Sequence, residues 1–321
     1  MDVFKTIILN MNNQIQKKNL NHSFIFFLFC NIFSFIVFKF SNFNISPLLC
    51  LFLILIIGVS HGSLDHEKGR KLFKIFNITS ISIFYISYIS ISILVVAIWI
   101  FMPSLSLIIF LLVASYHFGK EDTQFLISKV SIFNQILFFF KGLLIILAPM
   151  FFNFDDTVLI FKLILVDNEN FYLTLEFIES NRILPILIFV STLSSIYLFL
   201  KEFNLKKFSI FLDYFSILLL NYYLSPLVAF TMYFCFLHSV RHSMSLIYEI
   251  DNQNFSNGTK IFITKAIPLT ILTGIFCLIG LYLLNNIYGL DGSILKIIFI
   301  GLASLTFPHI LLEYFLEKNE K

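Results

Sequence analysis

The sequence predicts an all-α integral membrane protein, a polytopic helical bundle that crosses the bilayer many times. Hydrophobic residues make up 58% of the 321 residues, charged residues only 13%, and the mean hydropathy is +0.90. Soluble domains contain about 45–50% apolar and about 25% charged residues. This composition excludes an ordinary cytosolic enzyme and a disordered chain. A nucleic-acid-binding protein is also excluded, because the net charge is only +3 and no basic stripe is present.

Ten apolar segments follow one another along the chain, separated by short polar loops. A membrane-spanning helix needs about 20 apolar residues, so a chain of this length holds about eight to ten of them. No polar stretch is long enough for a second domain, and we expect 1–321 to form one transmembrane domain. The amino terminus lacks the features of a signal peptide, and the run 157–166 is too short to cross. The predicted segments are 23–41, 47–62, 77–102, 104–119, 131–153, 183–200, 208–224, 226–247, 261–287 and 294–315.

Positive charges in the loops predict the orientation of these segments. Lysine and arginine residues gather before the first segment and after the second, fourth, sixth, eighth and tenth. The alternate loops 42–46, 153–157 and 285–293 contain no lysine or arginine. Since cytoplasmic loops carry the excess of these residues, we expect both termini in the cytoplasm. The expected location is the cell (plasma or inner) membrane.

Histidine and carboxylate residues form four clusters, each late in an even-numbered segment. All four clusters therefore lie at one depth, toward the cytoplasmic side. Ionisable groups inside a membrane are costly and usually functional, so six histidines from four places in the sequence are expected to meet in one site. In chain order the clusters are His61, Asp65 and His66; His117, Glu121 and Asp122; His238 and His242; and His309 and Glu313.

The spacing within the clusters favours a metal site. His238 and His242 are four residues apart, so both imidazoles project from one helix face and can reach one metal. In the other clusters a carboxylate follows a histidine by four residues, and such a carboxylate can orient a ligating imidazole. No thiolate joins the set, because the four cysteines lie singly in apolar runs. An oxygen-activating iron fits these ligands better than structural zinc; a proton relay and solvated histidines at helix ends are the alternatives.

Other polar residues in the apolar segments have weaker interpretations. We expect Lys141 to extend its ammonium toward the interface and Asp213 to pair inside the bundle. Arg241 could bind a carboxylate of the site, but cytoplasmic headgroups are the favoured partner. His22, just before the first segment, is assigned no role. Three glycines beside the histidines are expected to allow close helix approach, namely Gly58, Gly62 and Gly119.

The motifs HGSLDH, SYHFGKED, HSVRH and PHILLE, in this order on alternate segments, resemble those of the Brp/Blh family of membrane-bound β-carotene 15,15′-dioxygenases. The resemblance covers the chain from the second segment to the tenth. It implies Fe2+-dependent cleavage of the central double bond of β-carotene by O2 into two molecules of all-trans-retinal, which a rhodopsin would receive. It implies four iron ligands, namely His61, His117, His238 and His242. Residues for a second iron or for support of the first are His66, His309, Asp65, Asp122 and Glu313.

The physical properties of β-carotene agree with these expectations. A hydrocarbon resides in the bilayer core, and recognition must rest on shape and apolar contact, with Tyr116 and Tyr233 as candidate contacts near the histidines. The alternatives are a di-iron desaturase or hydroxylase of a lipid, a divalent-metal or proton-coupled transporter, and an assembly protein. Desaturases have denser histidine boxes than this sequence. A transporter is disfavoured because the outward halves of the segments are nearly free of ionisable groups.

Overall fold

The structure is a computed structural model that describes residues 2–40, 45–127, 131–201 and 203–319, without the side chains of 2–14 and of His61. The described residues contain helices and no strand, which confirms the all-α prediction. Two elements are π-helical, η1 and η5, and three are 3-10 turns. In chain order the elements are α1 (Asp2–Lys39), α2 (Pro47–Leu53), η1 (Ile54–Gly58), η2 (Val59–Leu64), α3 (Asp65–Ile75), α4 (Ile81–Phe101), α5 (Pro103–Glu121), η3 (Gln124–Leu126), α6 (Ile132–Phe152), α7 (Phe154–Leu163), α8 (Glu169–Ser180), α9 (Ile183–Leu200), η4 (Leu205–Lys207), α10 (Phe208–Tyr223), α11 (Pro226–Met232), η5 (Tyr233–Ser239), α12 (Val240–Ile250) and α13 (Phe255–Asn319).

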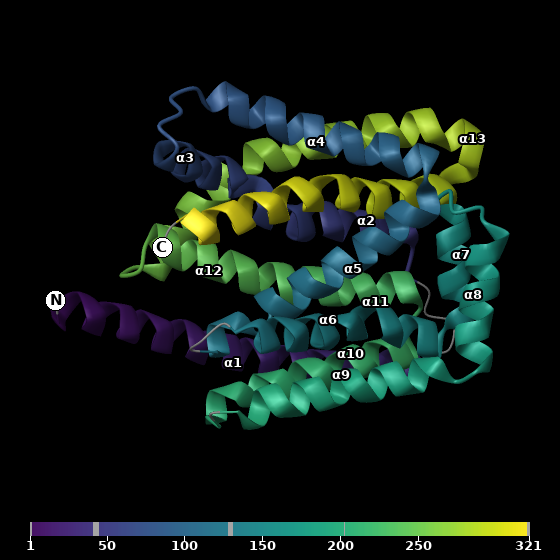
Figure 1. Cartoon of the computed structure of the whole chain (residues 1–321), viewed down its shortest axis with the longest axis horizontal. Helices are drawn as coiled ribbons and strands as arrows, with labels where there is room; N and C mark the ends of the chain where they lie inside the picture. Colours follow the sequence, from purple (N-terminus) through teal and green to yellow (C-terminus); the bar gives the residue numbers. More distant parts are fainter. Residues whose placement is uncertain (1, 41–44, 128–130, 202, 320–321) are drawn as a thin grey trace.

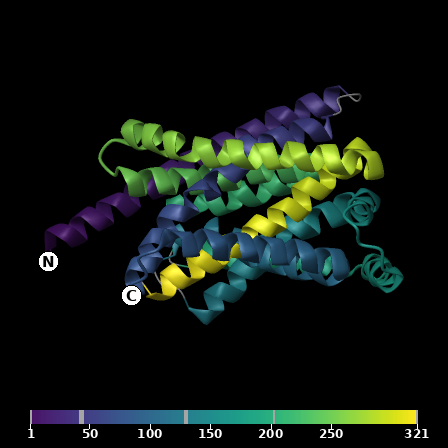
Figure 2. The ribbon, with the colours of Figure 1, turned by 90° about the horizontal axis from the view of Figure 1, so that it is seen from above.

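The long helices lie side by side along one direction, and both termini are at the same end of the bundle (Figures 1 and 2). At the other end, α7 and α8 stand across the bundle rather than along it (Figure 1). The Trp99 indole N–H donates to the backbone carbonyl of Ile164 at 2.9 Å, which ties the end of α4 to this layer. The run 157–166 therefore does not cross the bundle, as its length predicts.

Each of the ten predicted segments coincides with helix in the structure. Six helices are long and apolar enough to span a membrane, and the pair Pro47–Gly58 and Gly62–Ile75, bent by 42°, would be a seventh. The last of the six, α13, is two helices joined by a sharp turn at Gly289, whose φ of 69° and ψ of 173° suit a glycine. The chain is thus a polytopic helical membrane protein, and ten crossings with cytoplasmic termini stay a prediction.

Glycine lets α5 and α6 touch through their backbones. A β-carbon at Gly119 would lie 1.8 Å from the Phe138 carbonyl oxygen, and one at Gly142 would lie 1.9 Å from that of Ser115. Small residues at such crossings are typical of membrane helices. The expectation of close approach is confirmed for Gly119. It is wrong for Gly62, where the nearest atom to an added β-carbon is an Asp65 carboxylate oxygen at 3.9 Å, an ordinary contact. The backbone contact between α5 and α6 at Gly119 fixes the position of α5, the helix that carries His117.

Candidate metal centre

Four of the predicted histidines meet inside the bundle. They come from α5, η5, α12 and the second half of α13, and each of the four histidines is only 1–8% exposed. The rings stand in the order His238, His117, His309, His242, with successive centroids 5.4, 5.5 and 5.7 Å apart. This convergence joins three parts of the chain that are far apart in the sequence, namely α5, the consecutive elements η5 and α12, and α13.

Three of these histidines direct Nδ1 at a carboxylate whose side chain is at most 14% exposed. His309 Nδ1 lies 2.9 Å from Asp65, His242 Nδ1 lies 3.2 Å from Glu121, and His238 Nδ1 lies 3.4 Å from Asp122. A carboxylate accepts, so Nδ1 carries the proton and the lone pair is left on Nε2. Carboxylates in this role fix the tautomer and orientation of metal-binding histidines. The sequence predicts such carboxylates, but each serves a histidine of another helix rather than one in its own cluster.

The Glu313 carboxylate lies close to the imidazole rings of three of these histidines. Its Oε1 is 3.6 Å from His309 Nε2 and 3.8 Å from His242 Nε2, and its Oε2 is 3.9 Å from His117 Nδ1. His117, His309 and Glu313 each offer a ligand atom, and these atoms lie within 4.8 Å of one another. The three residues are therefore close enough together to hold a metal ion.

Lys68, one of the loop cations that predict the orientation, also enters the cluster. Lys68, in α3, places its ammonium 2.6 Å from Glu313 Oε1 and 3.4 Å from His242 Nε2. Its side chain is 15% exposed. The signal in the sequence was its position three residues after Asp65, on the same face of one helix.

A second set of buried groups supports the carboxylates. The Tyr88 hydroxyl donates to Asp65 at 2.8 Å, and the Tyr233 hydroxyl donates to Asp122 at 2.6 Å. Arg241 donates to both oxygens of Asp213 at 2.8 and 3.1 Å. The prediction that Asp213 pairs inside the bundle is confirmed, and the preference for headgroups as the partner of Arg241 is wrong. Both residues are buried because their charges neutralise each other.

Lys141 corrects another expectation. The residue is 6% exposed and lines a small cavity with Asp122, inside the bundle. The ammonium therefore does not extend to the membrane interface. Burial disfavours the charged ammonium at this depth, and the opposite charges of Asp122 and Asp213 partly offset that effect.

The two remaining histidines of the predicted set are His66 and His61. His66 directs Nδ1 at the Ser63 carbonyl at 3.1 Å and Nε2 at Glu67 at 3.5 Å. His61 belongs to η2, and its side chain lies outside the described residues. The ligand role expected for His61 therefore stays a prediction.

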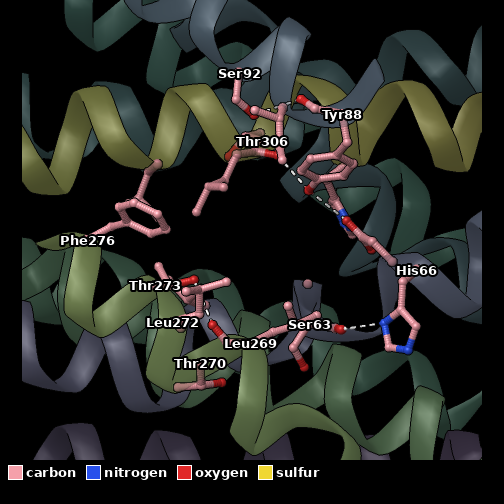
Figure 3. A pocket seen from close by; sticks show the side chains of 18 of the residues that line it. Ser63, His66, Tyr88, Ser92, Leu269, Thr270, Leu272, Thr273, Phe276 and Thr306 are labelled. Atoms are coloured by element: carbon pink, nitrogen blue, oxygen red, sulfur yellow. Dashed lines mark hydrogen bonds and ion pairs between the residues drawn. The ribbon is translucent and has the colours of Figure 1, made fainter. Parts of the chain in front are cut away.

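A cavity of about 420 Å³ adjoins the histidines. Its walls come mainly from η2, α4 and both halves of α13, and His117, His238 and His309 line one part of it. Figure 3 shows Tyr88, Thr306, Phe276 and Leu272 around the opening. Ile93, Leu272 and Phe276 are 63%, 47% and 64% exposed, on the apolar outer surface. The cavity therefore connects the histidines to the surface that faces lipid, between α4 and the first half of α13.

The tyrosines that line this cavity differ from those named from the sequence. Tyr85 and Tyr88 of α4 line it, whereas Tyr116 and Tyr233 are not among its lining residues. Tyr233 is buried behind the cluster, and its hydroxyl is used by Asp122. The elements that carry Tyr116 and Tyr233 do line the cavity, through Phe118 of α5 and Phe234 of η5, but the two tyrosines themselves are not in its lining.

The fold and the site define a class: a polytopic helical membrane protein with a buried histidine–carboxylate cluster beside an apolar cavity that opens to the lipid. The family described as Beta-carotene 15,15'-dioxygenase matches residues 52–317, and the chain belongs to this family. A protein of that name from an uncultured marine bacterium (66A03) is 28% identical over 276 residues, which cover 82% of this chain and 90% of that protein. No solved structure matches the chain.

Proposed function

We propose that this protein cleaves the central 15,15′ double bond of β-carotene with O2 and releases two molecules of all-trans-retinal. The observation that carries the proposal is the placement of the histidine–carboxylate cluster in the wall of a cavity that opens to lipid. Membership of the dioxygenase family and the name of the relative support the same reaction. A hydrocarbon substrate can enter such a cavity from the bilayer without passing through water.

The donor set fits Fe2+. Imidazole and carboxylate ligands suit non-haem iron, and we assign His117, His309 and Glu313 to the metal because their ligand atoms converge. His238 Nε2 is the next candidate, since its Nδ1 is held by Asp122 and its ring adjoins His117. Bound Fe2+ would supply the binding and activation of O2.

The charges buried around the site also fit a divalent cation. Among the described residues, five carboxylates gather around the site with three cations, and Lys120, whose side chain is also 15% exposed, lies near Glu121. Unbalanced charge inside a membrane protein is costly, so the excess of carboxylates favours a bound cation. The carboxylates are Asp65, Glu121, Asp122, Asp213 and Glu313, and the cations are Lys68, Lys141 and Arg241.

The side chains position the reactants and need not move protons. The overall reaction adds one O2 to one C=C bond and gives two C=O bonds, so no proton is gained or lost. Asp65, Glu121 and Asp122 hold the histidines by hydrogen bonds to Nδ1. Phe118 and Phe234 line the cavity beside the cluster and would contact the polyene while excluding water.

The side of the membrane follows from the loop charges. The cluster takes residues from the later parts of two helices: His117 lies four residues before the end of α5, and Glu313 lies six residues before the end of α13. Because the positive loops predict that this end is cytoplasmic, we place the site toward the cytoplasm of the cell membrane. A rhodopsin as the recipient of retinal stays a prediction.

Expression in cells that accumulate β-carotene tests the function. We expect the orange colour to fade and retinal to be detected by chromatography. His117→Ala should keep the colour, because it removes a proposed metal ligand. His22→Ala is the matched control and should bleach the cells like the parent. Persistent colour with well-folded, iron-loaded parent protein would refute the proposal.

A further inference from the structure

Tyr88 connects the wall of the cavity to the histidine cluster. Its hydroxyl donates to Asp65 at 2.8 Å, and Asp65 faces Nδ1 of His309 at 2.9 Å. His309 in turn offers a ligand atom to the group that could hold a metal. A carboxylate behind an imidazole fixes the orientation of that ring. The Tyr88 hydroxyl therefore acts on His309 through the carboxylate.

A second unit of the same composition supports another histidine of the cluster. The Tyr233 hydroxyl donates to Asp122 at 2.6 Å, and Asp122 faces Nδ1 of His238 at 3.4 Å. Tyr233 is 2% exposed and is not among the residues that line the cavity. Tyr88, by contrast, lines the cavity (Figure 3). A molecule in the cavity can therefore contact the Tyr88 ring, whereas the Tyr233 ring is out of its reach.

The helix that carries Tyr88, α4, has few anchors in the bundle. It forms one wall of the opening to lipid, and its buried residues are Phe84 and Trp99. Among the described residues, its side chains hydrogen-bond to other elements at two positions, Trp99 and Tyr88. Since Trp99 lies near the far end of α4, Tyr88 is the polar link between this helix and the bundle at the level of the cavity.

The Tyr88 hydroxyl has two acceptors within reach. It carries one proton, and it lies 2.8 Å from Asp65 and 3.2 Å from the backbone carbonyl of Leu305. A molecule that packs against the Tyr88 ring restricts its movement and keeps the hydroxyl on the nearer acceptor, Asp65. When one ligand has already ordered a group, a second ligand that needs the same order binds at lower cost.

We propose that Tyr88 couples the filling of the cavity to the metal centre. A polyene that packs against the Tyr88 ring keeps Asp65 in place behind His309 and so raises the affinity of the cluster for its metal. By linkage, bound metal raises the affinity of the cavity for the polyene by the same factor. Tyr88 is thus a positioning residue. The inference rests on the metal role and the polyene ligand proposed above, but not on the cleavage of that ligand.

Metal affinity with and without a polyene in the cavity tests this coupling. The purified full-length protein in lipid nanodiscs is stripped with chelator, kept free of O2 and titrated with Co2+ as a probe of the metal centre. Bound cobalt is measured by equilibrium dialysis and elemental analysis, without β-carotene and at saturating β-carotene. We expect β-carotene to raise the Co2+ affinity of the parent about fivefold, the equivalent of one hydrogen bond.

Three tyrosine variants separate the coupling from simple support of the metal. Tyr88→Phe keeps the ring and loses the hydroxyl, so it should bind Co2+ a few fold more weakly and show no effect of β-carotene. Tyr233→Phe loses the matching bond of the second unit. It should also bind Co2+ more weakly, but it should keep the fivefold effect. Tyr85→Phe, a second tyrosine of α4 in the cavity wall, should match the parent in both measurements.

Three outcomes would overturn the inference. They are an unchanged Co2+ affinity of the parent at saturating β-carotene, a full effect of β-carotene in Tyr88→Phe, and a loss of the effect in Tyr233→Phe or Tyr85→Phe. Retinal formation by the same samples, loaded with Fe2+ and exposed to O2, is measured separately. Coupling without retinal would refute the proposed function alone, and retinal without coupling would refute this inference alone.

Discussion

The buried ion pair between Arg241 and Asp213 allows a quantitative prediction. Arg241 lies between His238 and His242 in sequence and bonds Asp213 of α10 through both nitrogens, at 2.8 and 3.1 Å. It also donates to Ser23 at 2.7 Å, on α1. These bonds fix the rotation of the helix that carries both histidines. Both side chains are at most 3% exposed, so solvent does not screen the pair.

Removal of either partner alone leaves an uncompensated buried charge. Arg241→Met and Asp213→Leu should therefore each lower the free energy of unfolding by about 3–5 kcal/mol. The double variant replaces both charges with apolar groups, and it should lower the free energy of unfolding by no more than either single substitution does. The coupling free energy in the double-mutant cycle should therefore be at least about 3 kcal/mol.

Unfolding in mixed micelles, followed by circular dichroism as the dodecyl sulfate fraction rises, measures these differences. Co2+ affinity is measured in parallel and should fall in Arg241→Met, because rotation of the helix misplaces His238. A loss of less than about 1 kcal/mol of unfolding free energy in either single variant, the range found for exposed ion pairs, would contradict the assigned role. A double variant that costs the sum of the singles would contradict it too.

Three further outcomes are expected. Gly119→Ala should lower the free energy of unfolding by about 3 kcal/mol or more, because the added β-carbon would overlap a backbone carbonyl of α6, which cannot move without shifting the helix. Gly274→Ala is the control in the same unfolding assay. Its β-carbon would have no atom within 4 Å, so this variant should be neutral or stabilising. Asp65→Asn should weaken Co2+ binding by about 10–100-fold, since a neutral amide orients His309 less well; unchanged affinity would remove Asp65 from the supporting role. Ile93→Trp should raise the KM for β-carotene by narrowing the opening of the cavity, while Ile86→Trp, equally exposed on α4 but outside the cavity, should leave it unchanged.

Much of the fold follows from hydropathy and loop charge. Apolar runs predict helices, and all ten segments coincide with helix. The turn at Gly289 lies within the predicted loop 285–293, although only one residue there leaves helical geometry. The π-helical turn at Tyr233–Ser239, which carries His238, could not be predicted, because an apolar pattern does not distinguish a π-helical turn from an α-helix.

Four of the predicted histidines and four of the predicted carboxylates come together in the structure, but their pairing was not predicted. Spacing along one helix suggested that Glu313 serves His309 and that Asp65 serves His61. The structure pairs Asp65 with His309 and also brings Glu313 to Lys68. Such pairs depend on how neighbouring helices rotate against each other, which spacing within one helix does not contain. Lys68 was missed because a cation near a helix end normally indicates only topology.

The most direct test of the central claim uses purified protein reconstituted in lipid nanodiscs with β-carotene, loaded with Fe2+ and then exposed to O2. The protein is expected to form two molecules of retinal for each β-carotene consumed. Retinal formation should stop when the metal is removed with chelator and return when Fe2+ is restored. Retinal formation that persists in the chelated protein, or β-carotene that stays intact with one iron bound per chain, would contradict the claim that this cluster is an iron centre for carotene cleavage.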